Sequence, residues 1–126
     1  MQLQNITDIL AAQPALELGI LVGSRTNGTA GPGSDWDIAL QWSRDLSFME
    51  QLAATEQLRN SLTELLGVGE CAIDLIDIPS ARLTMRAVIA EEGIALKGAE
   101  SLAWHRFLQR TWRELEEIYW EQIYAA

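Results

Sequence analysis

Two aspartates separated by one residue, Asp35 and Asp37, are the strongest candidates for chemistry in this chain. Apolar and polar residues alternate over residues 35–42, which predicts a strand with both carboxylates on one face, about 7 Å apart at their Cα atoms. Two like charges held this close repel each other unless a cation lies beside them. Because carboxylate oxygens are the ligands that hard cations prefer, the pair predicts a Mg²⁺ or Mn²⁺ site.

A glycine–serine pair stands ten residues before the two aspartates. Gly23 and Ser24 follow an apolar segment, residues 15–22, that predicts a second strand, and a glycine-rich loop joins the two strands. A turn at the end of a strand can present backbone N–H groups and a hydroxyl to an anion. An anion beside metal-binding carboxylates favours the triphosphate of a nucleotide, with the cation between the two.

A third carboxylate would complete such a site, and the predicted strand at residues 71–78 offers two. Asp74 and Asp77 have opposite parity, so only one of them can face the Asp35–Asp37 pair. Asp74 is surrounded by apolar residues, where a charge is costly unless it faces a metal or a polar site. Asp77 lies next to a proline–serine turn, where a polar residue is ordinary. We therefore favour Asp74 and keep Asp77 as the alternative.

The remaining elements alternate between helices and strands and predict an α/β fold with a small mixed sheet of about four strands. Helical patterns cover residues 48–66, with Gly67 as the C-cap, and residues 80–93, with Ser80 as a candidate N-cap. A helix before Pro14, a short strand at 94–97 and a helix over about 101–124 complete the order. A loop joins the first two strands in place of a crossover helix, so the sheet is expected to be mixed.

The last predicted helix carries an apolar stripe at helical spacing, which is expected to cover the sheet. Surplus aromatic residues near its end are too many for a solvated face, and aromatic residues are favoured anchors at protein interfaces. The sequence therefore predicts that part of this helix contacts another chain. The stripe comprises Trp104, Leu108, Trp112, Leu115, Tyr119 and Ile123.

Length and charge restrict the possible partners. A chain of 126 residues is expected to form a single domain, residues 1–126. A net charge of −9 argues against a nucleic-acid polymer as ligand, whereas small molecules and proteins remain. No membrane span or signal peptide is recognised, so a cytoplasmic protein is expected. Cys71 has no disulfide partner and is expected to be a small core residue.

The segment Gly23-Ser24, ten residues, Asp35-Trp36-Asp37 resembles the motif of the polymerase-β-like nucleotidyltransferase superfamily. With Asp74 downstream and the short chain, it looks most like the minimal nucleotidyltransferases, the antitoxins of HEPN–MNT toxin–antitoxin pairs. The resemblance spans about residues 18–98. It implies a Mg²⁺-dependent enzyme that transfers AMP from ATP to a tyrosine hydroxyl of a HEPN ribonuclease toxin, within a hetero-oligomer.

By this resemblance Gly23, Ser24, Arg25 and Ser34 belong to the nucleotide-binding loop, and Ser24 contacts the phosphates. Asp35, Asp37 and Asp74 would bind up to two Mg²⁺ ions, and Asp74 could also act as general base. The chain departs from the family pattern at Asn27, Thr29 and Gly33, which leaves the metal ligands intact.

Two alternatives remain open at the level of sequence. The chain could be a catalytically weak antitoxin that blocks its ribonuclease by contact alone, since an acidic surface suits a basic partner. It could also be a small-molecule nucleotidyltransferase of the aminoglycoside-modifying type. That reading is less favoured because 126 residues leave no room for the helical substrate domain such enzymes usually add.

Overall fold

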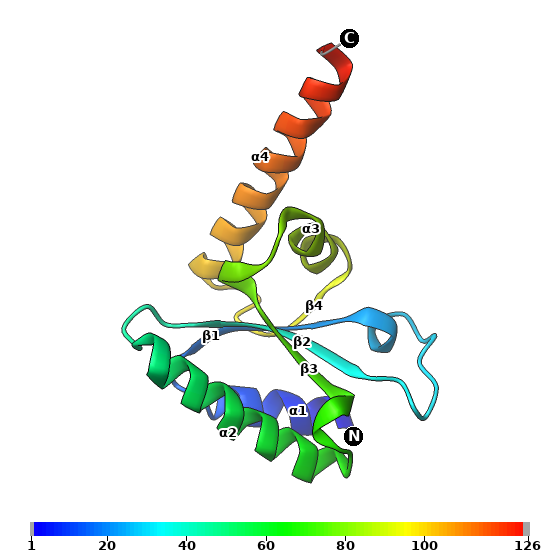
Figure 1. Ribbon diagram of the computed structural model, residues 1–126, viewed down its shortest axis with the longest axis vertical. Coiled ribbons are helices and arrows are strands. Elements are labelled where there is room, and N and C mark those ends of the chain that lie inside the picture. The colour runs from blue at the N-terminus through cyan, green and yellow to red at the C-terminus, as the bar shows by residue number, and fades with distance from the viewer. Residues whose placement is uncertain (1, 125–126) are drawn as a thin grey trace.

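The computed structural model describes residues 2–124 and confirms the predicted α/β fold, with a four-stranded mixed sheet flanked by helices (Figure 1). Short 3₁₀ turns follow β1 and lie on both sides of β3, at Gly23–Thr26, Glu70–Ala72 and Ile78–Ser80. In chain order the main elements are α1 (Gln2–Ala11), β1 (Leu16–Val22), β2 (Trp36–Trp42), α2 (Phe48–Leu66), β3 (Ile73–Asp77), α3 (Leu83–Glu92), β4 (Ile94–Lys97) and α4 (Leu102–Tyr124).

The strand order is β3-β2-β1-β4. β1 pairs with β2 and with β4 in antiparallel fashion, whereas β2 and β3 are parallel and are joined by the crossover helix α2. Since β1 is antiparallel to β2 and β3, the C-terminal end of β1 lies at the same end of the sheet as the N-terminal ends of β2 and β3. The glycine–serine turn and the aspartates of β2 and β3 therefore lie close together.

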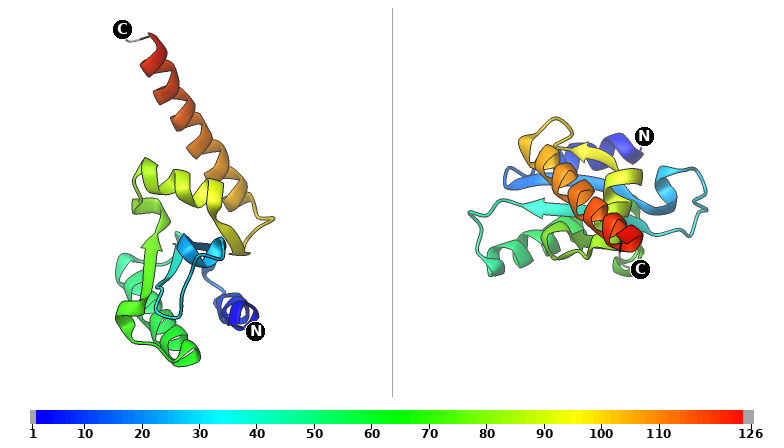
Figure 2. Two further views of the ribbon diagram at one scale, coloured as in Figure 1. Left: turned by 90° about the vertical axis from the view of Figure 1, so that its right-hand side faces the viewer. Right: turned by 90° about the horizontal axis from the view of Figure 1, so that it is seen from above.

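Each face of the sheet packs against two helices (Figures 1 and 2). On one face, α1 and α2 cover the side chains of β2 that the alternating pattern predicted to be apolar, including Trp36 and Ile38. On the other face, Ile89 of α3 and Phe107 of α4 pack against β1 and Ala39. The two aspartates of the β2 segment share the face of Ala39, because side chains two residues apart on a strand point the same way.

Local signals explain where the helices begin and end. α2 starts with a capping box, in which the Ser47 hydroxyl accepts from the Glu50 N–H and the Ser47 N–H donates to the Glu50 carboxylate. It ends at Gly67, whose φ of 64° is the left-handed conformation that glycine favours. These boundaries confirm the predicted helix. The accepted hydrogen bonds lower the pKa of Glu50.

Two local predictions were wrong. Ser80 is not the N-cap of α3, because its hydroxyl donates to Asp77 Oδ2 at 2.5 Å and the helix begins only after Arg82. Cys71 is not a core residue. It is exposed, because the chain forms a 3₁₀ turn at that point and β3 begins only at Ile73.

The predicted role of α4 as a cover for the sheet holds only for its first half. Trp104 and Leu108 pack against the core, but Trp112, Tyr119 and Ile123 are exposed. Figure 1 shows the reason, since the second half of α4 continues away from the sheet and from α3. No helix within residues 2–124 combines the length and apolar character needed to cross a bilayer.

Candidate functional site

The register between β2 and β3 places Asp74 directly opposite Asp37. Asp37 is in turn the partner of Val22, the last residue of β1, so it lies beside Gly23. Asp35 comes just before β2 and acts on Asp37 electrostatically. The three carboxylates predicted from the sequence are therefore close together at one end of the sheet.

Burial and like charge both act on Asp37, whose side chain is half-buried. Desolvation raises the pKa of Asp37 above its ordinary value, and the negative charges of Asp74 and Asp35 raise it further. The ionised form of Asp37 is thus disfavoured in the folded chain. A bound cation would lower the pKa of Asp37 again, since its positive charge offsets both the repulsion between the carboxylates and the loss of hydration.

This shift predicts how Asp37→Asn changes stability with pH. The folded chain holds the Asp37 proton to a higher pH than the unfolded chain, so the contribution of Asp37 to stability falls as pH rises above the ordinary aspartate pKa. An asparagine side chain cannot ionise, and we expect the Tm of the variant at neutral pH to exceed that of wild type by about 2–4 °C, a small gain because solvent screens a half-buried charge. Thermal melts as a function of pH check this. The two curves should converge in acid, and an equal difference at every pH would contradict the expectation.

Gly23 allows Asp37 to take its position. Its φ of 80° lies in the left-handed region, and a Cβ atom there would overlap Asp37 Oδ2. The carboxylate thus lies directly against the backbone of the turn. A glycine at this point serves both the conformation of the turn and the close approach of the acid.

The substitution Gly23→Ala is therefore expected to lower the free energy of unfolding by about 1–3 kcal/mol and to displace the Asp37 carboxylate. Two other glycines of the same loop serve as controls in urea unfolding. Gly28 also has a positive φ of 77° but open space around it, and Gly31 has neither constraint. Gly28→Ala should show backbone strain alone, and Gly31→Ala should be neutral or slightly stabilising. Equal losses for Gly23→Ala and Gly28→Ala would mean that contact with Asp37 is unimportant.

The loop between the turn and β2 is held by its own side chains. The Arg25 guanidinium donates to the Ser34 carbonyl at 2.7 Å and lies 4.2 Å from the centre of the Trp36 ring. The Ser34 hydroxyl accepts from the Gly31 N–H at 2.9 Å. Arg25 and Ser34 thus connect the loop to the beginning of β2. The Arg25 Nη2 and Ser34 Oγ atoms are engaged within the loop, whereas Arg25 Nε is buried without a hydrogen-bond partner from the described residues.

Asp77, the alternative third carboxylate, lies elsewhere. It is opposite Leu40, three pairs further along the strands than Asp74, and it binds Ser80. The motifs gave no sign of Arg59, a residue of α2 that donates to the Ile73 carbonyl at 2.6 Å. Arg59 therefore holds the beginning of β3, one residue before Asp74. This role is visible only in the folded structure, because the spacing of residues in the sequence does not connect Arg59 to the aspartates.

The carboxylates at this site suit a cation that is also bound by the substrate. Within residues 2–124, no three acidic, histidine or cysteine side chains converge enough to enclose a metal ion by themselves. Mg²⁺ is usually held by one or two carboxylates together with waters and substrate phosphates, and it rarely occupies a cage made by protein alone. Asp35, Asp37 and Asp74, next to a turn that could receive phosphates, match that pattern.

Comparison with known proteins agrees with this arrangement. The family model described as "Polymerase beta, Nucleotidyltransferase" matches residues 4–101, which include the turn, the loop and all three aspartates. The chain belongs to the polymerase β nucleotidyltransferase family. The matched region of this nucleotidyltransferase ends at residue 101, just before α4, so that all of α4 lies outside it. No curated protein matches the chain.

Several solved structures with the same fold are described as toxin–antitoxin complexes. One, described as a toxin–antitoxin with AMP-PNP, superposes with a TM-score of 0.73 at 24% identity, over 97% of this chain and 93% of that one. A second, described as the toxin–antitoxin MntA–HepT, has a TM-score of 0.66 at 23% identity, over 96% and 90% of the two chains. The nucleotidyltransferase resembles these chains over nearly their whole length.

A third structure is described as a tri-AMPylated Shewanella oneidensis HEPN toxin in complex with an MNT antitoxin. It has a TM-score of 0.66 at 22% identity and covers 96% of this chain and 89% of that one. At such identities the likeness shows the fold. The fold predicted from the resemblance is thus confirmed, whereas the roles of the individual site residues stay predictions.

Proposed function

We propose that this chain is an antitoxin that transfers AMP from ATP to a tyrosine hydroxyl of a HEPN ribonuclease toxin and thereby inactivates it. The observation that carries the proposal is the placement of Asp37 opposite Asp74 and against Gly23, with Asp35 close enough to act on Asp37. Membership in the nucleotidyltransferase family supports the reaction class. The AMPylated toxin in a complex of the same fold supports the choice of acceptor.

In the proposed reaction, Asp35, Asp37 and Asp74 hold Mg²⁺, and Gly23 and Ser24 receive the triphosphate through backbone N–H groups and the serine hydroxyl. Bound Mg²⁺ supplies positive charge that offsets the charge on the phosphates. The tyrosine oxygen bonds to the α-phosphorus, the bond from that phosphorus to the oxygen leading to the β-phosphate breaks, and pyrophosphate leaves. Asp74 accepts the proton of the tyrosine hydroxyl.

Arg25 and Ser34 have a supporting role in this proposal. Their hydrogen bonds and the stacking of Arg25 on Trp36 keep the loop in the conformation that presents Ser24. A preorganised loop avoids an ordering cost when the nucleotide binds. We therefore assign these two residues to positioning and assign the phosphate contacts to Gly23 and Ser24.

Inhibition by contact alone is the second candidate, and the exposed apolar residues of α4 favour it. Trp112, Tyr119 and Ile123 are 42%, 61% and 46% exposed, and their spacing places them on one side of the helix. A side of this kind is typical of a protein interface. We propose that it contacts the toxin, whether or not AMP is transferred.

One experiment separates the candidate functions. The chain is incubated with ATP labelled in the α-phosphate, Mg²⁺ and a HEPN ribonuclease, and both label and ribonuclease activity are followed. Label on the HEPN protein together with loss of ribonuclease activity is the expected result. Loss of ribonuclease activity without label would establish inhibition by contact. Label that appears only on an added aminoglycoside would establish the small-molecule reaction and overturn the proposal.

The toxin contact is tested by Tyr119→Ala/Ile123→Ala. Removing two exposed anchors is expected to weaken toxin binding by about 10-fold or more, because large apolar side chains dominate interface energetics. The variant should melt at the wild-type temperature, since neither side chain packs against the core. Titration calorimetry with the toxin measures the change, and Gln109→Ala, an exposed residue on the first half of α4, is the control. Wild-type affinity in the double variant would exclude this side of α4 from the interface.

A further inference from the structure

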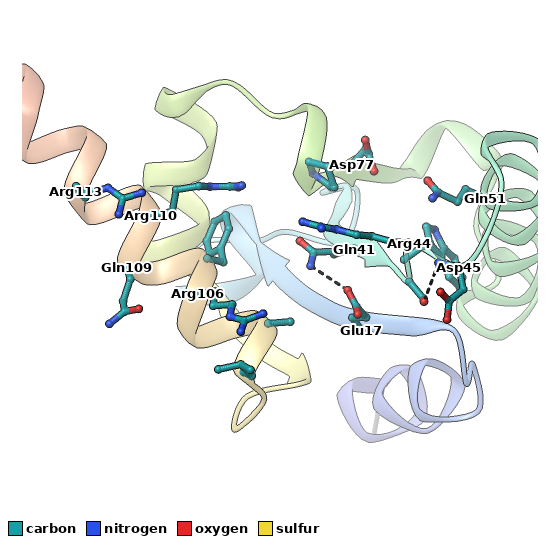
Figure 3. Close-up of a pocket in the computed structure, with 16 residues that line it drawn as sticks. Glu17, Gln41, Arg44, Asp45, Gln51, Asp77, Arg106, Gln109, Arg110 and Arg113 are labelled. Atoms are coloured by element: carbon teal, nitrogen blue, oxygen red, sulfur yellow. Dashed lines mark hydrogen bonds between the residues drawn. The ribbon is translucent and has the colours of Figure 1, made fainter.

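A groove with one basic wall lies at the other end of β2 from Asp35 and Asp37. It has a volume of about 940 Å³, and its walls are the first half of α4 and the loop between β2 and α2 (Figure 3). Four of the chain's nine basic residues line it together with three acidic ones, Glu17, Asp45 and Asp77, so the lining carries a formal charge of +1 in a chain of net charge −9. Figure 3 shows one of the basic residues on α4 and one on the loop pointing toward one another across the groove. The four basic residues are Arg44, Arg106, Arg110 and Arg113.

None of these arginines forms an ion pair with another described residue. The two salt bridges found between residues 2 and 124 join Arg59 to Glu56 and Arg86 to Glu114. All four groove arginines are exposed. Three of the four lie together along α4, so this wall of the groove is suited to the acidic groups of a partner, whereas the acidic residues of the lining belong to β1, the loop between β2 and α2, and β3.

The second half of α4 has the complementary pattern. Glu117 and Glu121 are exposed, form no ion pair in the part of the chain that the structure covers, and are four residues apart, as are Arg106 and Arg110. Seven residues separate Arg110 from Glu117, which is close to two helical turns, so all four lie on one side of α4. One side of the helix is therefore basic at the groove and acidic beyond it.

This pattern is self-complementary when two copies of α4 run antiparallel. If a two-fold axis passes midway between Arg113 and Glu114, then Arg106 of one copy lies opposite Glu121 of the other, and Arg110 lies opposite Glu117. Each pair occurs twice, as a two-fold interface requires. In this arrangement the basic half of each helix lies against the acidic half of the other.

Exposed aromatic residues fit the same pairing. Trp120 and Tyr124 are stacked with their ring centres 5.2 Å apart, and they are 48% and 73% exposed. In the antiparallel register Trp120 lies opposite Phe107 and Tyr124 lies opposite Ala103, both of which line the groove. The groove would thus bury apolar surface that a single copy leaves in water, which supplies a driving force that the ion pairs alone would lack.

We propose that the groove receives the second half of α4 from a second copy of this chain and that the protein forms an antiparallel, two-fold dimer through α4. The proposal does not depend on nucleotidyl transfer. It uses the side of α4 that carries Glu117 and Glu121, whereas the side assigned to the toxin carries Trp112, Tyr119 and Ile123, so one helix can serve both contacts. The overall negative charge opposes a nucleic acid in this groove.

Charge reversal gives a direct test by sedimentation of the full chain without toxin. Wild type is expected to dimerise at micromolar concentration and to dissociate as salt is added. Arg106→Glu/Arg110→Glu and Glu117→Arg/Glu121→Arg should each weaken the dimer by about 30-fold or more, because attractions in both halves become repulsions. An equimolar mixture of the two variants should form a heterodimer, since every reversed pair then regains an opposite charge.

The mixture also controls for misfolding, because a chain that fails to fold cannot be rescued by another. Arg82→Glu, a reversal at an exposed arginine outside the groove, should leave the dimer intact. Trp120→Ala/Tyr124→Ala should weaken it. A wild-type chain that stays monomeric at every concentration, or variants that remain monomeric when mixed, would overturn the proposal. A monomeric wild type whose toxin binding is lost in Arg106→Glu/Arg110→Glu would assign the groove to the toxin.

Discussion

Replacement of both Asp35 and Asp37 by asparagine is expected to lower the rate of AMP transfer by about 10³-fold or more. Asparagine keeps the shape of each side chain but removes the charge that holds Mg²⁺, and such an ion contributes several kcal/mol to phosphoryl transfer. Transfer of label from ATP to the toxin measures the loss. If the double variant labels the toxin at the wild-type rate, the end of the sheet that carries Asp35 and Asp37 is not the active site.

The folded state of the double variant can be checked independently of activity. Removal of repelling charges should leave it at least as stable as wild type, because Asp37 is disfavoured as an anion in the free chain. Mg²⁺ with ATP should raise the Tm of wild type, since a ligand that binds only the native state stabilises it. The same addition should leave the variant unchanged. Asp45→Asn, in the loop before α2, is a matched control for loss of a surface carboxylate.

The second large effect is expected from Asp74→Asn. Loss of the residue that accepts the tyrosine proton should reduce kcat by about 10²–10⁴-fold, the usual contribution of general-base catalysis. Asp77→Asn is the matched control, because it removes an aspartate from the same strand at a point where the carboxylate binds Ser80. Asp77→Asn should keep kcat within a few-fold of wild type.

The response to Mg²⁺ distinguishes a base from a residue that only holds the metal. A weakened metal site can be filled by a higher concentration of Mg²⁺, whereas a lost proton acceptor cannot be replaced in this way. Addition of Mg²⁺ should not restore the rate of the variant if proton transfer is what was lost. A larger loss in Asp77→Asn than in Asp74→Asn would reverse the assignment of the two aspartates.

Much of the arrangement around β2 could be predicted from the sequence because it follows from alternation. Trp36, Ile38 and the apolar residues that follow occupy one face of the strand, and this leaves Asp35 and Asp37 on the other. Parity along β3 allowed only one of its aspartates to face the pair, and the cost of a charge among apolar residues favoured Asp74; the observed register places Asp74 opposite Asp37. Whether these residues bind metal and transfer AMP remains a prediction.

The course of α4 could not be predicted from its pattern. α4 has 23 residues, and Figure 1 shows it rising away from the sheet instead of running across it. The apolar stripe therefore continues beyond the contact with the sheet, and periodicity alone does not show where a helix leaves the surface that it covers. The contacts of Arg25 and Arg59 were equally hidden, because each reaches a backbone carbonyl that no side-chain motif records.

The position of β3 at the edge of the sheet has a consequence for solubility. An edge strand leaves a row of backbone N–H and C=O groups free to pair with another chain, and short strands that carry charge resist such pairing. β3 has five residues, two of them aspartates, and so combines both protections. If Asp74 serves catalysis, as we propose, the same charge also keeps the apolar residues of this strand from acting as a template for aggregation.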